Sequence, residues 1–351
     1  MEQGKNANQL GEIRKLWDGM KGHNYGLPDS VKFILERIGR NEKRPDFWDI
    51  AALTGDTVSQ VYNHNLTTRC EYCVSGYLAG AEHIAYVFDT LGYDHEYTGV
   101  KKMIADMAFY QQKIMEYIDK GIPILVKANI ADIPGWKSDV GTYPLVIGYE
   151  NGGQILKMIV CNSGTIDYEM NEKCKLDLVF IGERKREVSL EELYLSTVRK
   201  MSHWLRLPER DGMFFGAAAY RVWADDIESG RFEDESIALW DNYGVYVCNL
   251  ATSGGLPAYI LRKLAEKNPV YSELAHVGEK IHTLLPSESP TGGKSLLWVQ
   301  LEELGGGMDM KAVRLTMRDK QKRAKVAAAL RNYADRLDQA VELLHGVETI
   351  V

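Results

Sequence analysis

The sequence lacks any long hydrophobic run. No stretch of the 351 residues approaches the roughly 20 consecutive apolar residues that a membrane-spanning helix needs. The first residues, MEQGKNANQLGEIRKLW, are polar and lack the apolar core of a secretion signal. Internal repeats and low-complexity linkers are missing too. These absences argue against a membrane protein and against a secreted protein, so we expect a cytoplasmic location and no membrane partner.

Cysteines are few and odd in number. The chain has five: Cys70, Cys73, Cys161, Cys174 and Cys248. An odd count in a long chain without a secretion signal argues against a disulfide framework, so reduced thiols are expected. Most of them should be small buried hydrophobic side chains.

The composition that is present is that of an ordinary globular protein. Hydrophobic residues make up 45% and charged residues 26%, and the length suffices for two domains. The net charge of -7 is spread over stretches of mixed sign. It favours solubility and argues against a nucleic-acid partner.

Apolar periodicity predicts helices in the first part of the chain. Residues 27–38 place apolar side chains on one face, with Pro28 in the first turn and Gly39 at the end. Asp46 is expected to cap a short helix over 47–53. Two longer helices are expected, one from about Cys73 to residue 91, ended by Gly92, and one over 100–120, ended by Gly121.

Strand signals follow. Short apolar runs predict strands over 122–128, 143–149, 154–161 and 175–182. The turn Glu150-Asn151-Gly152-Gly153 predicts a hairpin between the second and third of them. Helices first and an antiparallel sheet afterwards indicate an α+β domain.

From residue 188 onward the pattern is almost wholly helical. Ser189 and Glu192 predict a capping box for a helix toward residue 205. Further helices are expected over 214–227, 236–251 and 257–267, whereas 286–307 reads as irregular. A final helix carries an apolar stripe of Val326, Leu330, Tyr333, Leu337, Val341 and Leu344. We interpret the stripe as packed into its own domain, with a coiled-coil partner as the alternative. The expected domains are 1–187 and 188–351.

Several segments resemble known proteins. YGLPDSVKFILERIG, FWDIAALTGDTVSQVY, KGIPILV and YPLVIGYENGGQILKMIVCN occur in the order found in the papain-like domain of bacteriocin-processing peptidases. The match is closer to the N-terminal domain of butirosin-biosynthesis H-type proteins. FFGAAAYRVWADDI and SGGLPAYILRKLAEKNP are similar to that group's helical domain. The resemblance implies a papain-like fold followed by an all-α domain, and cysteine-based acyl transfer or amide hydrolysis as the family's chemistry.

The residues that this chemistry needs are mostly absent. A thiol hydrolase needs a thiolate at a helix N-terminus, an activating imidazole, a group that orients the imidazole and an oxyanion donor. In the family frame, Gly26 occupies the cysteine position and Tyr143 the histidine position. Asn162 fits the orienting position, but no Gln precedes the helix, where His23 and Asn24 are the nearest polar residues. The resemblance therefore implies a pseudoenzyme, with an emptied catalytic position.

The same frame predicts a ligand-binding cleft. Its expected lining residues are Asn24, Tyr25, Gly26, Asp56, Gln60, Tyr143 and Asn162. Asp56 and Gln60 lie just beyond a helix end at Gly55, so one of them could instead cap the helix or turn the chain. We favour this structural role over a place in the cleft.

A C-x-x-C pair, Cys70 and Cys73, is the rival candidate site. Cys73 would start a helix near Arg69, and both features would favour its thiolate. A zinc site would need a second closely spaced pair, which the sequence lacks. A redox site would need a thioredoxin-like context, which is also missing. Two structural cysteines are the simplest interpretation, and a catalytic Cys73 is the alternative. We expect no metal and no cofactor.

Three functional hypotheses follow. The favoured one is a non-proteolytic papain-like protein that binds a small molecule, a peptide or a carrier-bound acyl group in a cleft between its domains. The second is an acyltransferase or amidase whose relocated nucleophile is Cys73. The third is a structural protein that forms a homodimer through the apolar stripe of residues 326–344.

Overall fold

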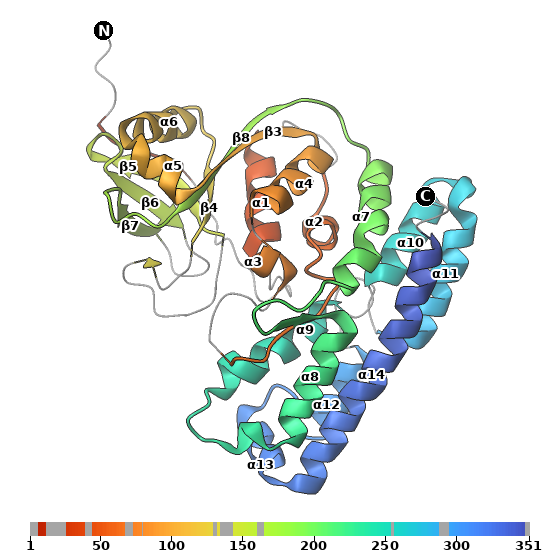
Figure 1. Cartoon of the computed structure of the whole chain (residues 1–351). Coiled ribbons are helices and arrows are strands. Elements are labelled where there is room, and N and C mark those ends of the chain that lie inside the picture. The colour runs from red at the N-terminus through yellow and green to blue at the C-terminus, as the bar shows by residue number, and fades with distance from the viewer. Residues whose placement is uncertain are drawn as a thin grey trace. The chain divides into compact units, whose positions relative to one another are not determined.

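The chain forms two compact units. The computed structural model describes residues 6–11, 26–38, 44–66, 73–78, 80–128, 132–133, 143–159, 165–253, 256–287 and 295–347 (Figure 1). The first unit comprises Met1–Ile50 and Leu78–Val188, and the second comprises Ala51–Tyr77 and Ser189–Val351. The division after Val188 lies one residue from the expected boundary. The segment Ala51–Tyr77, by contrast, is grouped with the second unit, whereas the expected domains 1–187 and 188–351 place it in the first domain.

The first unit contains an antiparallel sheet. Among the described residues its strands are β1 (Asn8–Gln9), β3 (Tyr93–Thr98), β4 (Ile124–Lys127), β5 (Leu145–Glu150), β6 (Ile155–Ile159), β7 (Thr165–Glu169) and β8 (Asp177–Arg184). They are ordered β3-β8-β4-β5-β6-β7, and β1 also pairs with β5. The hairpin of β5 and β6 turns at η3 (Asn151–Gly153), where Gly152 has a φ of 62°. The predicted hairpin is confirmed, and the mixture of helices with an antiparallel sheet is that of an α+β fold.

The helices of the first part of the chain are α1 (Gly26–Ile38), α2 (Phe47–Leu53), α3 (Val74–Leu78), α4 (Ala81–Leu91), α5 (Val100–Ala105) and α6 (Met107–Asp119). The helix predictions over 27–38 and 47–53 are confirmed. Asp46 does cap α2, because its carboxylate accepts the N–H of Asp49 at 3.0 Å while Asp49 accepts the N–H of Asp46 at 3.0 Å.

Two predicted long helices are each divided. The expected helix from Cys73 to residue 91 is interrupted before α4, where Gly80 adopts an extended backbone with ψ of 177°. The expected helix over 100–120 breaks at Asp106, whose φ of -139° is not helical. The strand β3 was not predicted, because its sequence YDHEYT is polar and lacks the apolar run of the other strands. Strands β1 and β7 were missed as well.

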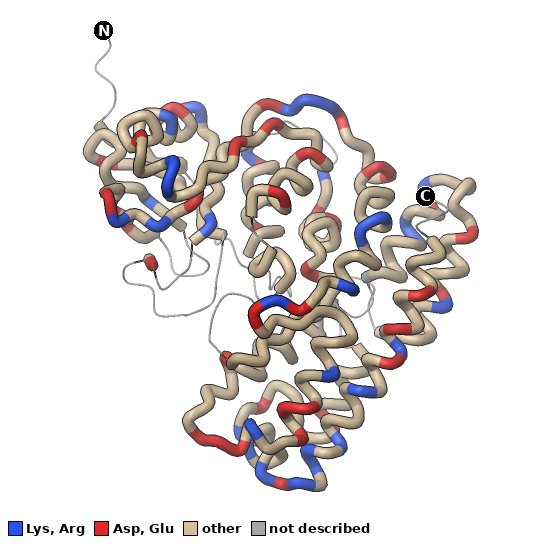
Figure 2. Tube along the Cα trace, in the orientation of Figure 1, with Lys and Arg blue, Asp and Glu red and all other residues tan. Residues whose placement is uncertain are grey.

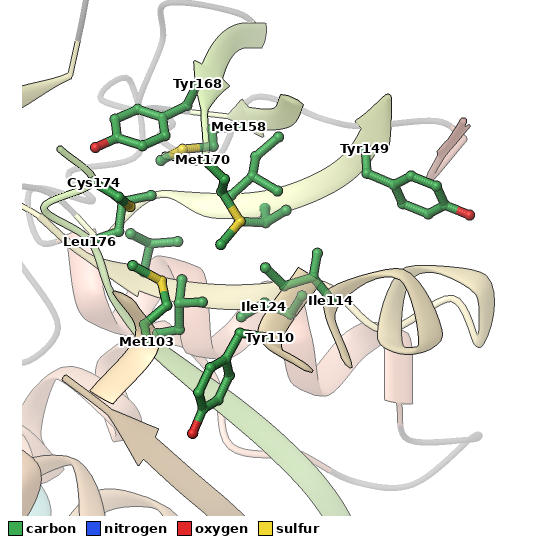
Figure 3. Close-up of a cluster of buried hydrophobic side chains, with 14 of the residues drawn as sticks. Met103, Tyr110, Ile114, Ile124, Tyr149, Met158, Tyr168, Met170, Cys174 and Leu176 are labelled. Atoms are coloured by element: carbon green, nitrogen blue, oxygen red, sulfur yellow. The ribbon is translucent and has the colours of Figure 1, made fainter. Parts of the chain in front are cut away.

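Helices α5 and α6 bury their apolar faces against this sheet (Figure 3). Met103 of α5 and, one helical turn apart on α6, Tyr110 and Ile114 belong to a core that includes Ile124 and Met158. Cys174 belongs to the same core with 2% of its surface exposed, as expected for a small buried hydrophobic residue.

The second unit is mainly helical. Its described helices after residue 188 are α7 (Leu190–Leu205), α8 (Gly216–Glu228), η5 (Arg231–Glu233), the π-helical turn η6 (Trp240–Gly244), α9 (Val245–Ser253), α10 (Leu256–Lys267), η7 (Pro269–Tyr271), α11 (Ser272–Leu284), α12 (Leu296–Glu303), α13 (Met310–Arg318) and α14 (Lys320–Val347). A two-stranded sheet pairs β2 (Val61–Asn63) with β9 (Met213–Phe215). The capping box of Ser189 and Glu192 is confirmed. The stretch 286–307, expected to be irregular, contains α12, and the helix expected over 236–251 begins with the π-helical turn.

Helix α14 packs along α8 through the predicted apolar stripe. All six stripe residues are buried: Val326, Leu330, Tyr333, Leu337, Val341 and Leu344. The interpretation of the stripe as the core of its own domain is confirmed, so this face is not available for a homodimer. At the rim of the contact, Arg221 pairs with Asp335 and Asp338, while Arg331 pairs with Asp225 and Glu228.

Charges of both signs interleave along these helices, as Figure 2 shows. None of the helices in the described residues combines the length and the apolar character that crossing a bilayer requires.

Candidate functional site

The first turns of α1 lie beside the segment that precedes β5. The hydroxyl of Ser30, in the first turns of α1, donates a 2.5 Å hydrogen bond to the backbone carbonyl of Tyr143. Gly26 is the first residue of the same helix. The two positions that the family frame assigns to nucleophile and base are therefore carried by neighbouring elements of the first unit. Gly26 offers no functional group there, and Tyr143 is buried with 5% of its surface exposed.

The other predicted cleft residues are distributed differently. Asn24, Tyr25 and Asn162 lie outside the described residues. Asp56 and Gln60 belong to the second unit, whereas Gly26 and Tyr143 belong to the first.

Asp56 is a buried carboxylate that holds the start of α3. It accepts hydrogen bonds from the N–H and the hydroxyl of Ser75, both at 2.7 Å, and from the hydroxyl of Thr54 at 2.9 Å. Burial raises the pKa of Asp56 from 3.8 to about 6, although these hydrogen bonds act to lower it. The capping role is the one that its contacts support, but the helix it caps is α3, not the helix that ends beside it.

Gln60 is buried at the junction of β2 and α8. Its side-chain amide donates to the carbonyl of Val61 at 3.1 Å, and its backbone carbonyl accepts the N–H of Gly216 at 2.9 Å. Its side-chain oxygen is buried and has no hydrogen-bond partner among the described residues. These contacts fix the chain where β2 begins.

Cys73 lies in surroundings that oppose a thiolate. It is 5% exposed, and its sulfur lies 3.6 Å from the hydroxyl of Ser75. Burial is the main cause that raises the pKa of the Cys73 thiol, and the nearby Asp56 carboxylate raises it further. Helix α3 has only five residues. None of these contacts favours a thiolate, and the structural interpretation fits them. Arg69, whose charge was expected to favour the thiolate, lies outside the described residues. Cys70 lies outside the described residues.

We therefore expect Cys73 to react slowly with thiol reagents. In the native protein, iodoacetamide near neutral pH should label Cys73 at least about tenfold more slowly than a free small thiol, because the neutral, buried thiol is not nucleophilic. Peptide mapping by mass spectrometry measures the rate, and a Cys73→Ser variant identifies the peptide. Labelling of Cys73 faster than the free thiol would restore the hypothesis of a relocated nucleophile.

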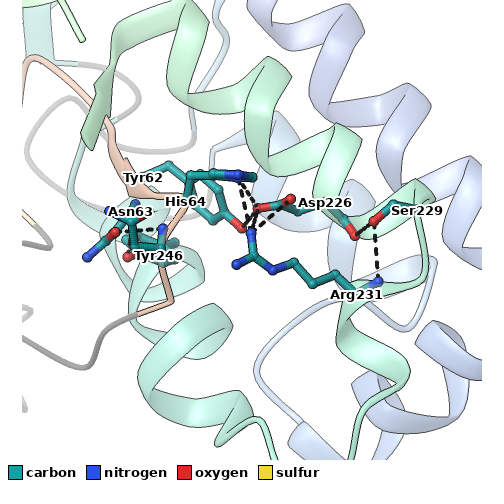
Figure 4. Close-up of polar contacts among 8 residues, drawn as sticks. Tyr62, Asn63, His64, Asp226, Ser229, Arg231 and Tyr246 are labelled. Carbon is teal, nitrogen blue, oxygen red and sulfur yellow. Dashed lines mark hydrogen bonds and ion pairs between the residues drawn. The ribbon is translucent and has the colours of Figure 1, made fainter. Parts of the chain in front are cut away.

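A polar cluster that the sequence did not reveal occupies the second unit (Figure 4). The carboxylate of Asp226 accepts a hydrogen bond from Tyr62 at 2.7 Å and lies 3.0 Å from the Nδ1 atom of His64. Nη1 of Arg231 lies 3.2 and 3.1 Å from the two carboxylate oxygens and 3.1 Å from His64 Nδ1. The Asp226 side chain is 8% exposed, whereas that of His64 is 48% exposed. This is a half-exposed imidazole held by a buried acid.

The local fold explains how these residues meet. β9 leads directly into α8, and β9 pairs with β2 so that Tyr62 is opposite Phe214. Tyr62 consequently stacks on Trp223 of α8, with ring centroids 6.0 Å apart. Asp226 lies three residues after Trp223, one helical turn further on the same face.

The buried position beside Asp226 also keeps Tyr62 protonated. Burial is the main cause that raises the pKa of Tyr62, and the charge of Asp226 raises it further. Tyr62 therefore keeps its proton and remains a hydrogen-bond donor. The only local signal in the sequence is the pair Asp225-Asp226 at the end of α8. The first aspartate pairs with Arg331 on the surface, and the second is buried. Among the described residues no group of three or more His, Cys, Asp or Glu side chains gathers in a way that could hold a metal ion.

Comparison with known proteins does not identify this arrangement. No protein-family model matches the chain, and no curated protein matches its sequence.

Proposed function

We propose that the chain is a non-proteolytic member of the papain-like group, similar to the butirosin-biosynthesis H-type proteins, and that it binds a small molecule, a peptide or a carrier-bound acyl group beside the start of α1. The observation that carries the proposal is the hydrogen bond from Ser30 to the carbonyl of Tyr143. It joins the helix whose first residue would be the nucleophile to the segment that would carry the base.

The chemistry of the described residues supports binding without cleavage. Gly26, the first residue of α1, has no functional group. The described cysteines, Cys73, Cys174 and Cys248, are in no disulfide, and burial raises the pKa of each of them. None of the three is therefore prepared to act as a thiolate. Free thiols also fit a reducing compartment such as the cytoplasm, which we propose as the location.

The proposal is tested by blocking the helix start. A short peptide, a small amide and an acyl-pantetheine thioester are titrated against the protein by calorimetry. At least one of them should bind, and Gly26→Trp should weaken that binding by more than about tenfold because the indole would compete with the ligand for the proposed position beside the helix start. Gly11→Trp is the matched control, since a Cβ atom added at Gly11 meets nothing within 4 Å.

Two results would contradict the proposal. Binding that is equal in the wild type and in Gly26→Trp would place the ligand elsewhere, and binding of none of the three probes would remove the proposed ligand classes. Turnover of the thioester that disappears in Cys73→Ser would instead support the acyltransferase hypothesis.

A further inference from the structure

The cluster of His64, Asp226 and Arg231 lies in the second unit and has no part in the proposed function. One oxygen of Asp226, Oδ2, is at its centre. It accepts the hydroxyl of Tyr62 at 2.7 Å and an N–H of Arg231 Nη1 at 3.1 Å, and Nδ1 of His64 lies 3.0 Å from it (Figure 4). Arg231 Nη1 also lies 3.1 Å from that Nδ1. The three atoms Oδ2, Nη1 and Nδ1 are thus each within hydrogen-bonding distance of the other two.

These three contacts cannot all be attractive at the same time. The guanidinium of Arg231 only donates, and the ionised carboxylate of Asp226 only accepts. Nδ1 of His64 donates when it carries a proton and accepts when it does not. A proton on Nδ1 makes the contact with Asp226 favourable and opposes the Arg231 donor. Without that proton, Nδ1 accepts from Arg231, so the position of one proton selects the partner of His64.

The acceptor sites of Asp226 indicate which state the observed contacts represent. A carboxylate oxygen has two lone pairs, and those of Oδ2 are used by Tyr62 and Arg231. Tyr62 is 0% exposed and remains a donor, so it does not give up its place. A third donor can reach Oδ2 only if Arg231 leaves it. The observed contacts therefore fit a neutral His64 whose proton is on Nε2 and whose Nδ1 accepts from Arg231.

Arg231 is the member of the cluster that can move. Its side chain is 31% exposed, whereas that of Asp226 is 8% exposed. Within the described residues its guanidinium contacts only Asp226 and His64. It begins the three-residue helix η5, directly after Gly230, whose φ is 87°. The side chain of His64 is 48% exposed, so a proton from the solvent can reach it.

The charges near His64 come from several elements. In the described part of the chain, the titratable and charged groups on the elements that contact His64 are Asp226 of α8, Arg231 of η5, Tyr62 of β2, and Glu209, Arg210 and Asp211 of the loop before β9. In that loop, the Glu209 carboxylate accepts the N–H of Gly212, and Arg210 pairs with Asp211 at 3.8 Å. The ring of Phe214, at 6.5 Å, is uncharged. Asp226 and Arg231 are thus the charges in direct contact with the imidazole.

We propose that this cluster is a proton-controlled switch that holds or releases Arg231. When His64 is neutral, Nη1 of Arg231 bridges Asp226 and Nδ1 of His64. When Nδ1 takes up a proton from the solvent, Nδ1–H donates to Oδ2 of Asp226, and the positive imidazolium displaces Arg231 from that oxygen. Histidine is the side chain that ordinarily changes its charge between pH 5 and 8, so mild acidification should release Arg231.

The tautomer of His64 is the first test. Nitrogen-15 chemical shifts of histidine-labelled protein distinguish a protonated from an unprotonated ring nitrogen, and His64→Gln identifies the signal. At about pH 8 we expect the proton on Nε2 and none on Nδ1, because Nδ1 accepts from Arg231. A neutral His64 with its proton on Nδ1 would overturn the proposal.

Charge variants of Arg231 provide the second test. The midpoint of the His64 titration, followed by the same signals, should rise by about one pH unit in Arg231→Gln, because the cation that opposes protonation is removed. Arg231→Lys keeps the charge and should change the midpoint less. Arg221→Gln is the matched control, since Arg221 pairs with Asp335 and Asp338 of α14 and should leave the midpoint near that of the wild type. An unchanged midpoint in Arg231→Gln would contradict the coupling.

Hydrogen exchange measures the release itself. The peptide that contains η5 should exchange its backbone N–H groups at least about threefold faster at about pH 5.5 than at about pH 7.5, after correction for the intrinsic pH dependence of exchange, because η5 loses the anchoring of Arg231. His64→Gln should abolish this difference. His276→Gln, which removes an exposed histidine of α11, should keep it. A difference that persists in His64→Gln, or that is missing in the wild type, would overturn the proposal.

Discussion

Replacement of Gly92 by alanine should destabilise the first unit by at least about 3 kcal/mol. Gly92 ends α4 with a φ of 79°, a backbone conformation that costs an L-residue free energy. A Cβ atom at this position would also lie 2.6 Å from the carbonyl oxygen of Arg186 and 2.9 Å from a methyl group of Val188. The backbone cannot retreat easily, because the carbonyl of Gly92 accepts the N–H of Lys185 at 2.8 Å. Urea denaturation followed by circular dichroism measures the loss.

Gly121 provides a matched control for this prediction. It follows α6 with a φ of 82°, and a Cβ atom there would meet nothing within 4 Å. Gly121→Ala should therefore cost only about 1 kcal/mol, the price of the backbone conformation alone. Equal losses in Gly92→Ala and Gly121→Ala would show that the approach of Arg186 is not the cause.

The buried acid Asp56 should make the second unit less stable as the pH rises. Its pKa lies at about 6 in the folded chain instead of 3.8, so the folded state favours the protonated acid. That stability is fully present below pH 3.8 and is lost as the pH rises through about 6. The shift corresponds to about 3 kcal/mol. The free energy of unfolding of the wild type, relative to Asp56→Asn, should fall by about this amount between about pH 4 and about pH 7.

Tryptophan fluorescence during urea unfolding measures this difference. Asparagine can accept the Ser75 N–H and donate to the hydroxyls of Ser75 and Thr54, so Asp56→Asn is expected to fold. Asp234→Asn is the control in the same unit. Hydrogen bonds from Ser236 lower the pKa of the exposed Asp234, so its contribution has the opposite sign and is lost as the pH falls. A wild type and an Asp56→Asn variant with parallel pH profiles would contradict the assignment of the slope to Asp56.

Much of the local structure could be predicted because its signals act over a few residues. The cap of Asp46, the capping box of Ser189 and the hairpin turn at Gly152 depend on hydrogen bonds between neighbours in the chain. The division of the long helices at Gly80 and Asp106 could not be predicted in the same way. Nothing in the local apolar pattern marks Asp106, and its backbone conformation is set by the packing of α5 and α6 against the sheet.

The candidate sites show the same difference between what local sequence reveals and what depends on tertiary contacts. The sequence alone determined that Gly26 and Tyr143 carry neither a thiol nor an imidazole, and the papain-like frame in which they and Asn162 are placed is part of the proposal. Residue identity is local information, so an absent functional group is visible without a fold. Only the tertiary structure decided that Asp56 caps α3, that Cys73 is buried beside it, and that Asp226 holds His64 across 162 residues of sequence. Burial and contacts with distant side chains determine the protonation state and the hydrogen-bond partners of each group. Burial and contacts depend in turn on how β2, β9 and α8 pack together.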